Sequence, residues 1–108
     1  MEVRRYCSSD GTDEFGTWPG SLADARAKAA ILVRIARIGL GNLGDFKPVG
    51  NGVLELRIDH GPGYRVYCAR VGQELILLLG GGDKRRQARD IRVAQVRLDD
   101  YRARSTPR

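Results

Sequence analysis

Charged and hydroxyl side chains alternate with apolar ones in two neighbouring segments of the chain. Glu55 and Arg57 alternate with leucine and isoleucine in residues 53–58, and Arg65 and Tyr67 do the same in residues 64–68. A period of two predicts half-buried antiparallel strands with one face in the core and the other in solvent. If the strands pair through residues 59–63, Arg57 and Arg65 lie within reach of one phosphate group.

Arginine suits such a site, because its planar guanidinium binds two phosphate oxygens at once. Lys47 precedes these strands and Lys84 follows them, so both can add charge to the same side of the sheet. The pattern therefore predicts a phosphate-binding face. It is more often typical of an ordinary half-exposed sheet, which also alternates charged with apolar residues.

The chain lacks the residues that several other kinds of catalytic or binding site require. His60 is the single histidine and stands beside a Gly-Pro-Gly turn, which excludes a two-histidine ribonuclease and a histidine-rich metal centre and leaves no plausible Ser-His-Asp triad. Cys7 and Cys68 are far apart and lack the spacing of metal ligands or redox pairs. The glycine runs at 39–44 and 80–82 do not match phosphate-binding loops. We expect no metal and no cofactor.

Composition predicts one globular domain with a basic surface. The 108 residues carry 19 Lys and Arg against 13 Asp and Glu, a net charge of +6. Such a surplus favours nucleic acid, the ribosome or an acidic protein as partner, although it can also serve solubility alone. No apolar run is long enough to span a bilayer and no signal peptide is evident, so we expect a cytoplasmic protein without a membrane partner.

The elements expected around the two strands complete an α+β domain. Residues 2–7 form a short strand, and residues 22–38 form a helix with Ser21 as N-cap and a solvated stripe of Arg26, Arg34 and Arg37. Residues 41–52 form a turn. Residues 75–79, apolar throughout, form a central strand that ends at the glycines 80–82, and Asp83 caps a last helix. The domain covers residues 1–104, and residues 105–108 form a frayed basic tail.

Four ordered blocks stand out in the chain: residues 41–50 (GNLGDFKPVG), 52–58 (GVLELRI), 61–67 (GPGYRVY) and 78–84 (LLGGGDK), the last followed by Gln87 and Asp90-Ile91. Together they resemble the RelE/HigB-type toxins of bacterial type II toxin-antitoxin systems, the addiction module killer proteins of the RelE/ParE superfamily. Trp18, Leu22 and Asp24 match more weakly. The resemblance covers roughly residues 15–100, and ordered blocks are more specific than one short motif.

The resemblance implies a RelE-like fold, with helices packed on one face of an antiparallel sheet. It also implies a hydrolase of the mRNA interferase kind, a ribosome-dependent endoribonuclease that cleaves mRNA by metal-free attack of a ribose 2′-hydroxyl and arrests translation. The implied partners are mRNA, the ribosome and a cognate antitoxin of helix-turn-helix type. Operator DNA would be bound only through the toxin-antitoxin complex.

On this resemblance Arg57, Arg65, Lys84 and Lys47 are candidate catalytic residues, and Glu55, Tyr67 and Gln87 are candidate substrate-binding residues. Some RelE-type toxins have a tyrosine or histidine near the start of the last helix, where this chain has Arg89, Asp90 and Ile91. The general base is therefore unassigned, with Glu55 and a lysine as alternatives. Two other functions stay open: a ParE-like gyrase poison, and a decayed toxin that only binds its antitoxin as co-repressor.

Overall fold

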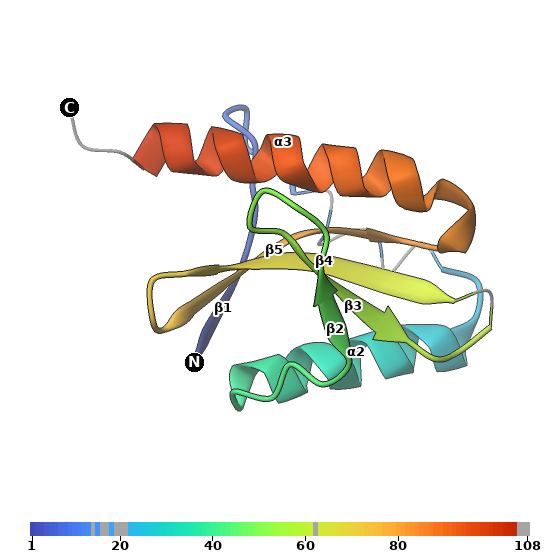
Figure 1. Cartoon of the computed structure of the whole chain (residues 1–108). Coiled ribbons are helices and arrows are strands. Elements are labelled where there is room, and N and C mark those ends of the chain that lie inside the picture. The colour runs from blue at the N-terminus through green and yellow to red at the C-terminus, as the bar shows by residue number, and fades with distance from the viewer. Residues whose placement is uncertain (14, 16–17, 19–21, 62, 106–108) are drawn as a thin grey trace.

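The structure, a computed structural model, describes residues 1–13, 15, 18, 22–61 and 63–105. It is a five-stranded sheet between two helices (Figure 1). The elements in chain order are β1 (Glu2–Arg5), α2 (Ala25–Gly39), β2 (Phe46–Pro48), β3 (Leu54–Ile58), β4 (Tyr64–Val71), β5 (Leu75–Gly82), the 3-10 helix η1 (Lys84–Arg86) and α3 (Gln87–Ser105). No helix of the described part is long and apolar enough to cross a membrane.

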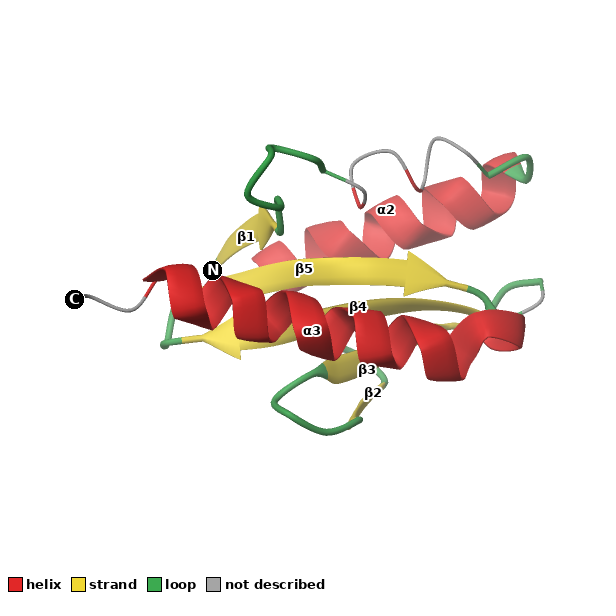
Figure 2. Cartoon of the chain, turned by 90° about the horizontal axis from the view of Figure 1, so that it is seen from above, coloured by secondary structure: helices red, strands yellow, loops and turns green. Residues whose placement is uncertain are grey.

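The sheet has the strand order β1-β5-β4-β3-β2. Strands β3, β4 and β5 form the expected antiparallel meander, and β2 adds to it antiparallel to β3. The α+β class and the single sheet are therefore confirmed. The sheet is nevertheless mixed, because β1 pairs in parallel with β5, as the view from above shows at the sheet edge (Figure 2).

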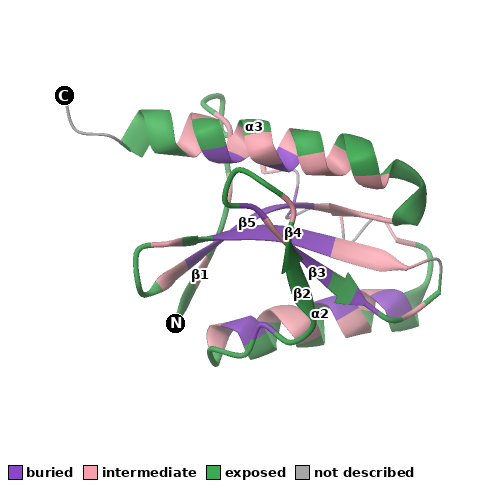
Figure 3. Cartoon of the chain, viewed as in Figure 1, coloured by how far each residue is buried: buried purple, intermediate pink, exposed green. Residues whose placement is uncertain are grey.

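The helices lie on opposite faces of the sheet, which differs from the one-sided arrangement that the resemblance implies. Ile31 and Ile38 of α2 pack in one apolar cluster, and Ala94 and Leu98 of α3 pack in another. The central strand requires this, since Ile76 and Leu78 of β5 enter the first cluster and Leu77 and Leu79 enter the second. A strand that is apolar on both faces needs cover on both. Figure 3 shows the buried residues of β4 and β5 between the helices.

Aspartates cap α2 and η1, the 3-10 turn that leads into α3. Asp24, rather than the predicted Ser21, caps α2, and its carboxylate accepts from the backbone amides of Arg26 and Ala27. Ser21 lies outside the described residues. Asp83 accepts from the Arg85 amide, which confirms it as the cap before the last helix. That helix includes Ser105, expected in the frayed tail, and residues 106–108 lie outside the described part.

The strands extend beyond the predicted ones. Residues 46–48, expected within a turn, form β2, and the glycines expected to end β5 belong to it. Opposite the step from Tyr67 to Cys68, β5 carries one extra residue, Leu79, whose carbonyl accepts from the Arg97 guanidinium at 2.6 Å. This is a β-bulge, which bends the strand and frees a carbonyl from the ladder. Glycine at 80–82 allows side chains from both layers to lie directly against this part of the backbone.

Arg34 is not part of a solvated stripe. Its guanidinium donates to the carbonyls of Leu43, Asp45 and Arg57 at 2.6–3.1 Å. One side chain of α2 thus holds the loop before β2 and the end of β3. Because Asp45 leads directly into β2, Arg34 also positions the strand that carries Lys47.

We predict that Arg34→Met lowers the free energy of unfolding by about 2–3 kcal/mol, because three carbonyls lose a charged donor. Urea unfolding followed by circular dichroism measures this change. Arg37→Met is the matched control on the same helix, where the side chain is exposed, and it should cost less than about 0.5 kcal/mol. Equal losses in the two variants would contradict the bracing role of Arg34.

Candidate functional site

A buried carboxylate lies at the centre of the site. Glu55 on β3 is fully buried, and it is the one charged residue with that property among those described. Its Oε2 accepts from the Tyr67 hydroxyl at 3.2 Å and from the Gln87 amide at 2.9 Å. Its Oε1 has no hydrogen-bond partner among the described residues. Burial without compensation would be costly for an ionised carboxylate, so its surroundings must supply positive charge.

Three cations supply that charge. The Arg65 Nε lies 3.5 Å from Glu55 Oε1, and the Arg57 Nε and Lys47 Nζ each lie 3.9 Å from the same oxygen. One carboxylate oxygen is thus shared by groups from three adjacent strands. At these distances the contacts are ion pairs rather than short hydrogen bonds.

The strand register explains the convergence. Lys47 on β2 is directly opposite Glu55 on β3, Glu55 is opposite Tyr67 on β4, and Arg57 is opposite Arg65. Directly opposed residues on one face have neighbouring Cβ atoms. The predicted pairing of Arg57 with Arg65 across the turn is therefore confirmed, and all five side chains share the α3 side of the sheet because their strand neighbours enter the α2 cluster.

The remaining two candidates come from the start of the last helix. Gln87 is the first residue of α3 and binds Glu55 directly. Lys84 is exposed in η1 and borders the turn before β4: a Cβ added at Gly63 would lie 3.9 Å from the Lys84 Cβ and 3.5 Å from an Arg65 guanidinium nitrogen. The Gly63 carbonyl in turn accepts from Arg65 at 2.8 Å. All seven predicted residues therefore gather at one end of α3.

Exposure divides these residues into two kinds. The side chains of Arg57 and Lys47 are 51% and 48% exposed, whereas that of Arg65 is 11% exposed. Glu55 and Tyr67 are fully buried, which differs from the solvent-exposed face expected from the strand pattern. Neither side chain is open to direct contact with a ligand. The accessible chemistry is cationic, and it suits binding and neutralising a phosphate group.

Tyr67 serves the carboxylate as a permanent donor. Burial, reinforced by the nearby Glu55 charge, raises the pKa of Tyr67 far above its ordinary value. The hydroxyl therefore keeps its proton at neutral pH and donates it to Glu55. A phenolate at this position plays no part in the site.

Other reactive groups lie elsewhere. His60 contacts Asp24 at 3.0 Å and so ties the turn before β4 to the start of α2. Burial raises the pKa of the Cys68 thiol to about 12, so this thiol is not a nucleophile at neutral pH. Among the described residues no three His, Cys, Asp or Glu side chains are grouped as metal ligands would be.

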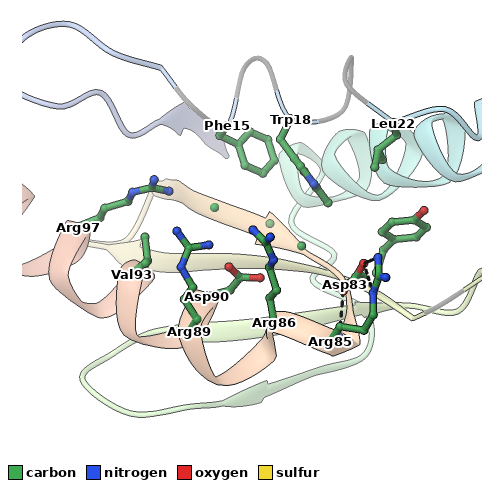
Figure 4. A pocket seen from close by; sticks show the side chains of 14 residues that line it. Phe15, Trp18, Leu22, Asp83, Arg85, Arg86, Arg89, Asp90, Val93 and Arg97 are labelled. Atoms are coloured by element: carbon green, nitrogen blue, oxygen red, sulfur yellow. Dashed lines mark hydrogen bonds and ion pairs between the residues drawn. The ribbon is translucent and has the colours of Figure 1, made fainter.

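A polar pocket lies beside the start of α3, and none of the sequence patterns predicts it. It has a volume of about 450 Å³. Figure 4 shows arginines of η1 and α3 on one wall, Phe15, Trp18 and Leu22 on the other, and β5 between them. The spacing of Arg85, Arg86 and Arg89 was a visible signal, but a helical charge run usually marks a solvated face.

Comparison with known proteins finds one relative with substantial identity. An uncharacterized protein of Haemophilus influenzae is 49% identical to the chain over 82 residues, which are 76% of this chain and 83% of that protein. The chain belongs to the same family as this protein. No family model matches the chain, and no solved structure matches it significantly. Membership of this family therefore brings a shared fold and no assigned activity.

We predict that Glu55→Gln lowers the free energy of unfolding by about 2–4 kcal/mol, because it removes the anion that three cations share. Tyr67→Phe should cost about 1 kcal/mol, because Glu55 Oε2 keeps its bond to Gln87. Urea unfolding of both variants measures the difference. A larger loss in Tyr67→Phe than in Glu55→Gln would show that the hydroxyl, and not the charge, holds the site together.

Proposed function

We propose that the chain is a ribosome-dependent mRNA endoribonuclease of the RelE/HigB type, the toxin of a toxin-antitoxin pair. The observation that carries the proposal is the cluster of Arg57, Arg65 and Lys47 around the buried Glu55. The four sequence blocks that resemble RelE/HigB toxins include every residue of this cluster. The net charge of +6 supports a polyanionic partner.

In the proposed reaction the ribose 2′-oxygen attacks the adjacent phosphorus, and the bond from phosphorus to the 5′-oxygen breaks. The 2′-hydroxyl gives its proton to a base, and the leaving 5′-oxygen takes up a proton. Negative charge grows on the phosphate oxygens between these events. Arg57 and Arg65 neutralise that charge, a contribution typically worth about 2.7–4 kcal/mol for one well-placed donor.

The other residues of the site support the two arginines. Lys47 and Lys84 are both exposed, and the one that does not act as base binds a phosphate that flanks the cleaved one. Glu55 holds Arg57, Arg65 and Lys47 at fixed positions before the substrate arrives, so little reorganisation is needed during reaction. Tyr67 and Gln87 hold Glu55 in turn.

Exposure favours a lysine over Glu55 as the general base. Glu55 is fully buried beneath the cations, whereas Lys84 and Lys47 are exposed at the rim. A general base must come within hydrogen-bond reach of the 2′-hydroxyl, which an exposed side chain can do and a buried one cannot. The proton for the 5′-oxygen then comes from the same protonated lysine or from water.

We predict that Arg57→Ala lowers the rate of mRNA cleavage in a translating bacterial extract by about 100-fold or more, because the transition-state charge loses a donor. Primer extension on a defined mRNA measures the rate. Arg57 is the preferred target because its side chain is half exposed, and Arg65→Ala is the second variant. Arg70→Ala, an exposed position at the far end of β4, is the matched control and should cleave like wild type.

Cleavage in the extract, together with the response of cells that express the protein, separates the alternative functions. Unchanged cleavage by both Arg57→Ala and Arg65→Ala would remove the arginine pair from the mechanism. Intact mRNA with induced DNA damage in cells expressing the wild type would indicate a gyrase poison instead. Normal growth of such cells would indicate a decayed toxin.

The proposed partner is a cognate antitoxin of helix-turn-helix type, and the pair would bind operator DNA as one complex. The expected result is growth arrest when the chain is expressed alone and recovery when the product of an adjacent gene is expressed with it. Expression of Arg57→Ala with and without that product is the control, because loss of cleavage should remove the arrest without removing the complex.

A further inference from the structure

We propose that the pocket beside the start of α3 binds one nucleotide of the RNA, with its phosphate on Arg86 and Arg89 and its base on the aromatic wall. This inference rests on the proposed RNA-cleaving function and names a second contact with the same substrate. The pocket is lined by 14 residues from η1, α3, β5, the start of β4 and the segment before α2 (Figure 4).

The cationic wall provides the phosphate contact. The side chains of Arg86 and Arg89 point into the pocket from α3 and its 3-10 start (Figure 4). Arg85 pairs with Asp83 at 3.0 Å, and Arg97 donates to the Leu79 carbonyl, so these two are engaged with the protein itself. The Arg86 amide donates to the Asp83 carbonyl, but the guanidinium groups of Arg86 and Arg89 form no close ion pair or hydrogen bond with other described residues, and the nearby Asp90 carboxylate acts on both only through its charge. They are therefore available to an anionic ligand.

The opposite wall is aromatic. Trp18 lies 5.9 Å from the Phe15 ring and 6.4 Å from the Tyr64 ring, measured between ring centroids. Phe15 is buried, whereas Trp18 and Tyr64 are partly exposed and line the pocket. Nucleobases stack on such side chains, and unpaired RNA bases are commonly recognised in this way. An inorganic anion would use the arginines and leave this wall without a role.

The glycines of β5 form the floor and bring the walls together. A Cβ added at Gly81 would overlap the Trp18 ring, and one added at Gly82 would overlap the Asp90 carboxylate. Asp90 is partly buried, and this burial raises the pKa of its carboxyl above its ordinary value. Its carboxylate lies between the side chains of Arg86 and Arg89 (Figure 4), where it can accept from N–H groups on the edge of a base. Guanine suits it best, because two neighbouring N–H donors match two carboxylate oxygens.

The pocket adjoins the candidate catalytic site. Gln87 binds Glu55, and the preceding Arg86 lines the pocket. Arg65 faces Glu55, and the preceding Tyr64 lines the pocket. Gly82 on the pocket floor is directly opposite Arg65 in the sheet. A strand of RNA that crosses the start of α3 therefore meets the cations of one site and the aromatic wall of the other.

The test uses Trp18, which is the single tryptophan of the chain. The full chain is titrated with GMP, with ribose 5-phosphate and with hexaglutamate while Trp18 fluorescence is recorded. We expect saturable quenching by GMP and binding of ribose 5-phosphate that is about tenfold weaker, because it lacks the stacked base. Equal binding of the two phosphates would overturn the base contact. A response to hexaglutamate alone would identify an acidic protein segment as the occupant and overturn the proposal.

Two variants locate the binding. Arg89→Ala should weaken GMP binding about tenfold, because a charged hydrogen bond to phosphate is lost. Arg92→Ala removes the same charge from an exposed position one turn further along α3, outside the pocket, and should change binding by less than about twofold. Equal effects of the two variants would show general attraction to a basic helix and no pocket.

The failures of the two proposals are distinguishable. If GMP quenches Trp18 but wild-type protein leaves mRNA intact in the extract, the pocket stands and the nuclease function is wrong. If wild-type protein and Arg89→Ala cut the same mRNA positions at the same rate and GMP has no effect on Trp18, the nuclease function stands and the pocket proposal is wrong.

Discussion

The burial of the Glu55 carboxylate is the constraint on which the site depends. A carboxylate removed from water is stable only if hydrogen bonds and opposite charges replace its hydration. Here the hydrogen bonds come from Tyr67 and Gln87, and the charges come from Lys47, Arg57 and Arg65. These partners belong to β2, β3, β4 and α3, so one buried charge links the register of three strands to the position of a helix. A slip of one residue in either strand pair would turn the cations to the other face.

The same arrangement concentrates positive charge where it can be used. Cations held this close together repel each other, and the shared anion offsets that repulsion while leaving the outer faces of Arg57 and Lys47 open to solvent. The supports lie outside the cluster: Arg34 braces the ends of β2 and β3, and the Gly63 carbonyl holds Arg65. Because these cations are in place before a ligand arrives, they need little reorganisation to stabilise negative charge during a reaction.

The start of α3 separates two surfaces with different chemistry. Gln87 binds Glu55 at the centre of the cation cluster, and Lys84 borders the Gly63 turn beside Arg65. Arg86 and Arg89 instead line the pocket with the aromatic wall. The short 3-10 turn after Asp83 produces this division, because successive side chains of a tight helix point in different directions. A single ligand that crosses this turn can contact both surfaces, and an extended chain with alternating phosphates and bases has the required form.

The sequence by itself determined the local elements and the list of candidate residues. Period-two alternation placed Arg57 and Arg65 together on one face, and the Asp83 cap was readable because it depends on residues close in the chain. Tertiary structure decided the rest. Segments distant in sequence decide whether Glu55 is exposed to solvent or buried, and whether Arg34 faces solvent or three carbonyls. They also decide on which sides of the sheet the helices pack. The pocket at the start of α3 also depends on segments distant in sequence. Its arginines come from η1 and α3, its aromatic wall comes from the segment before α2 and from β4, and the two meet only across the glycines of β5.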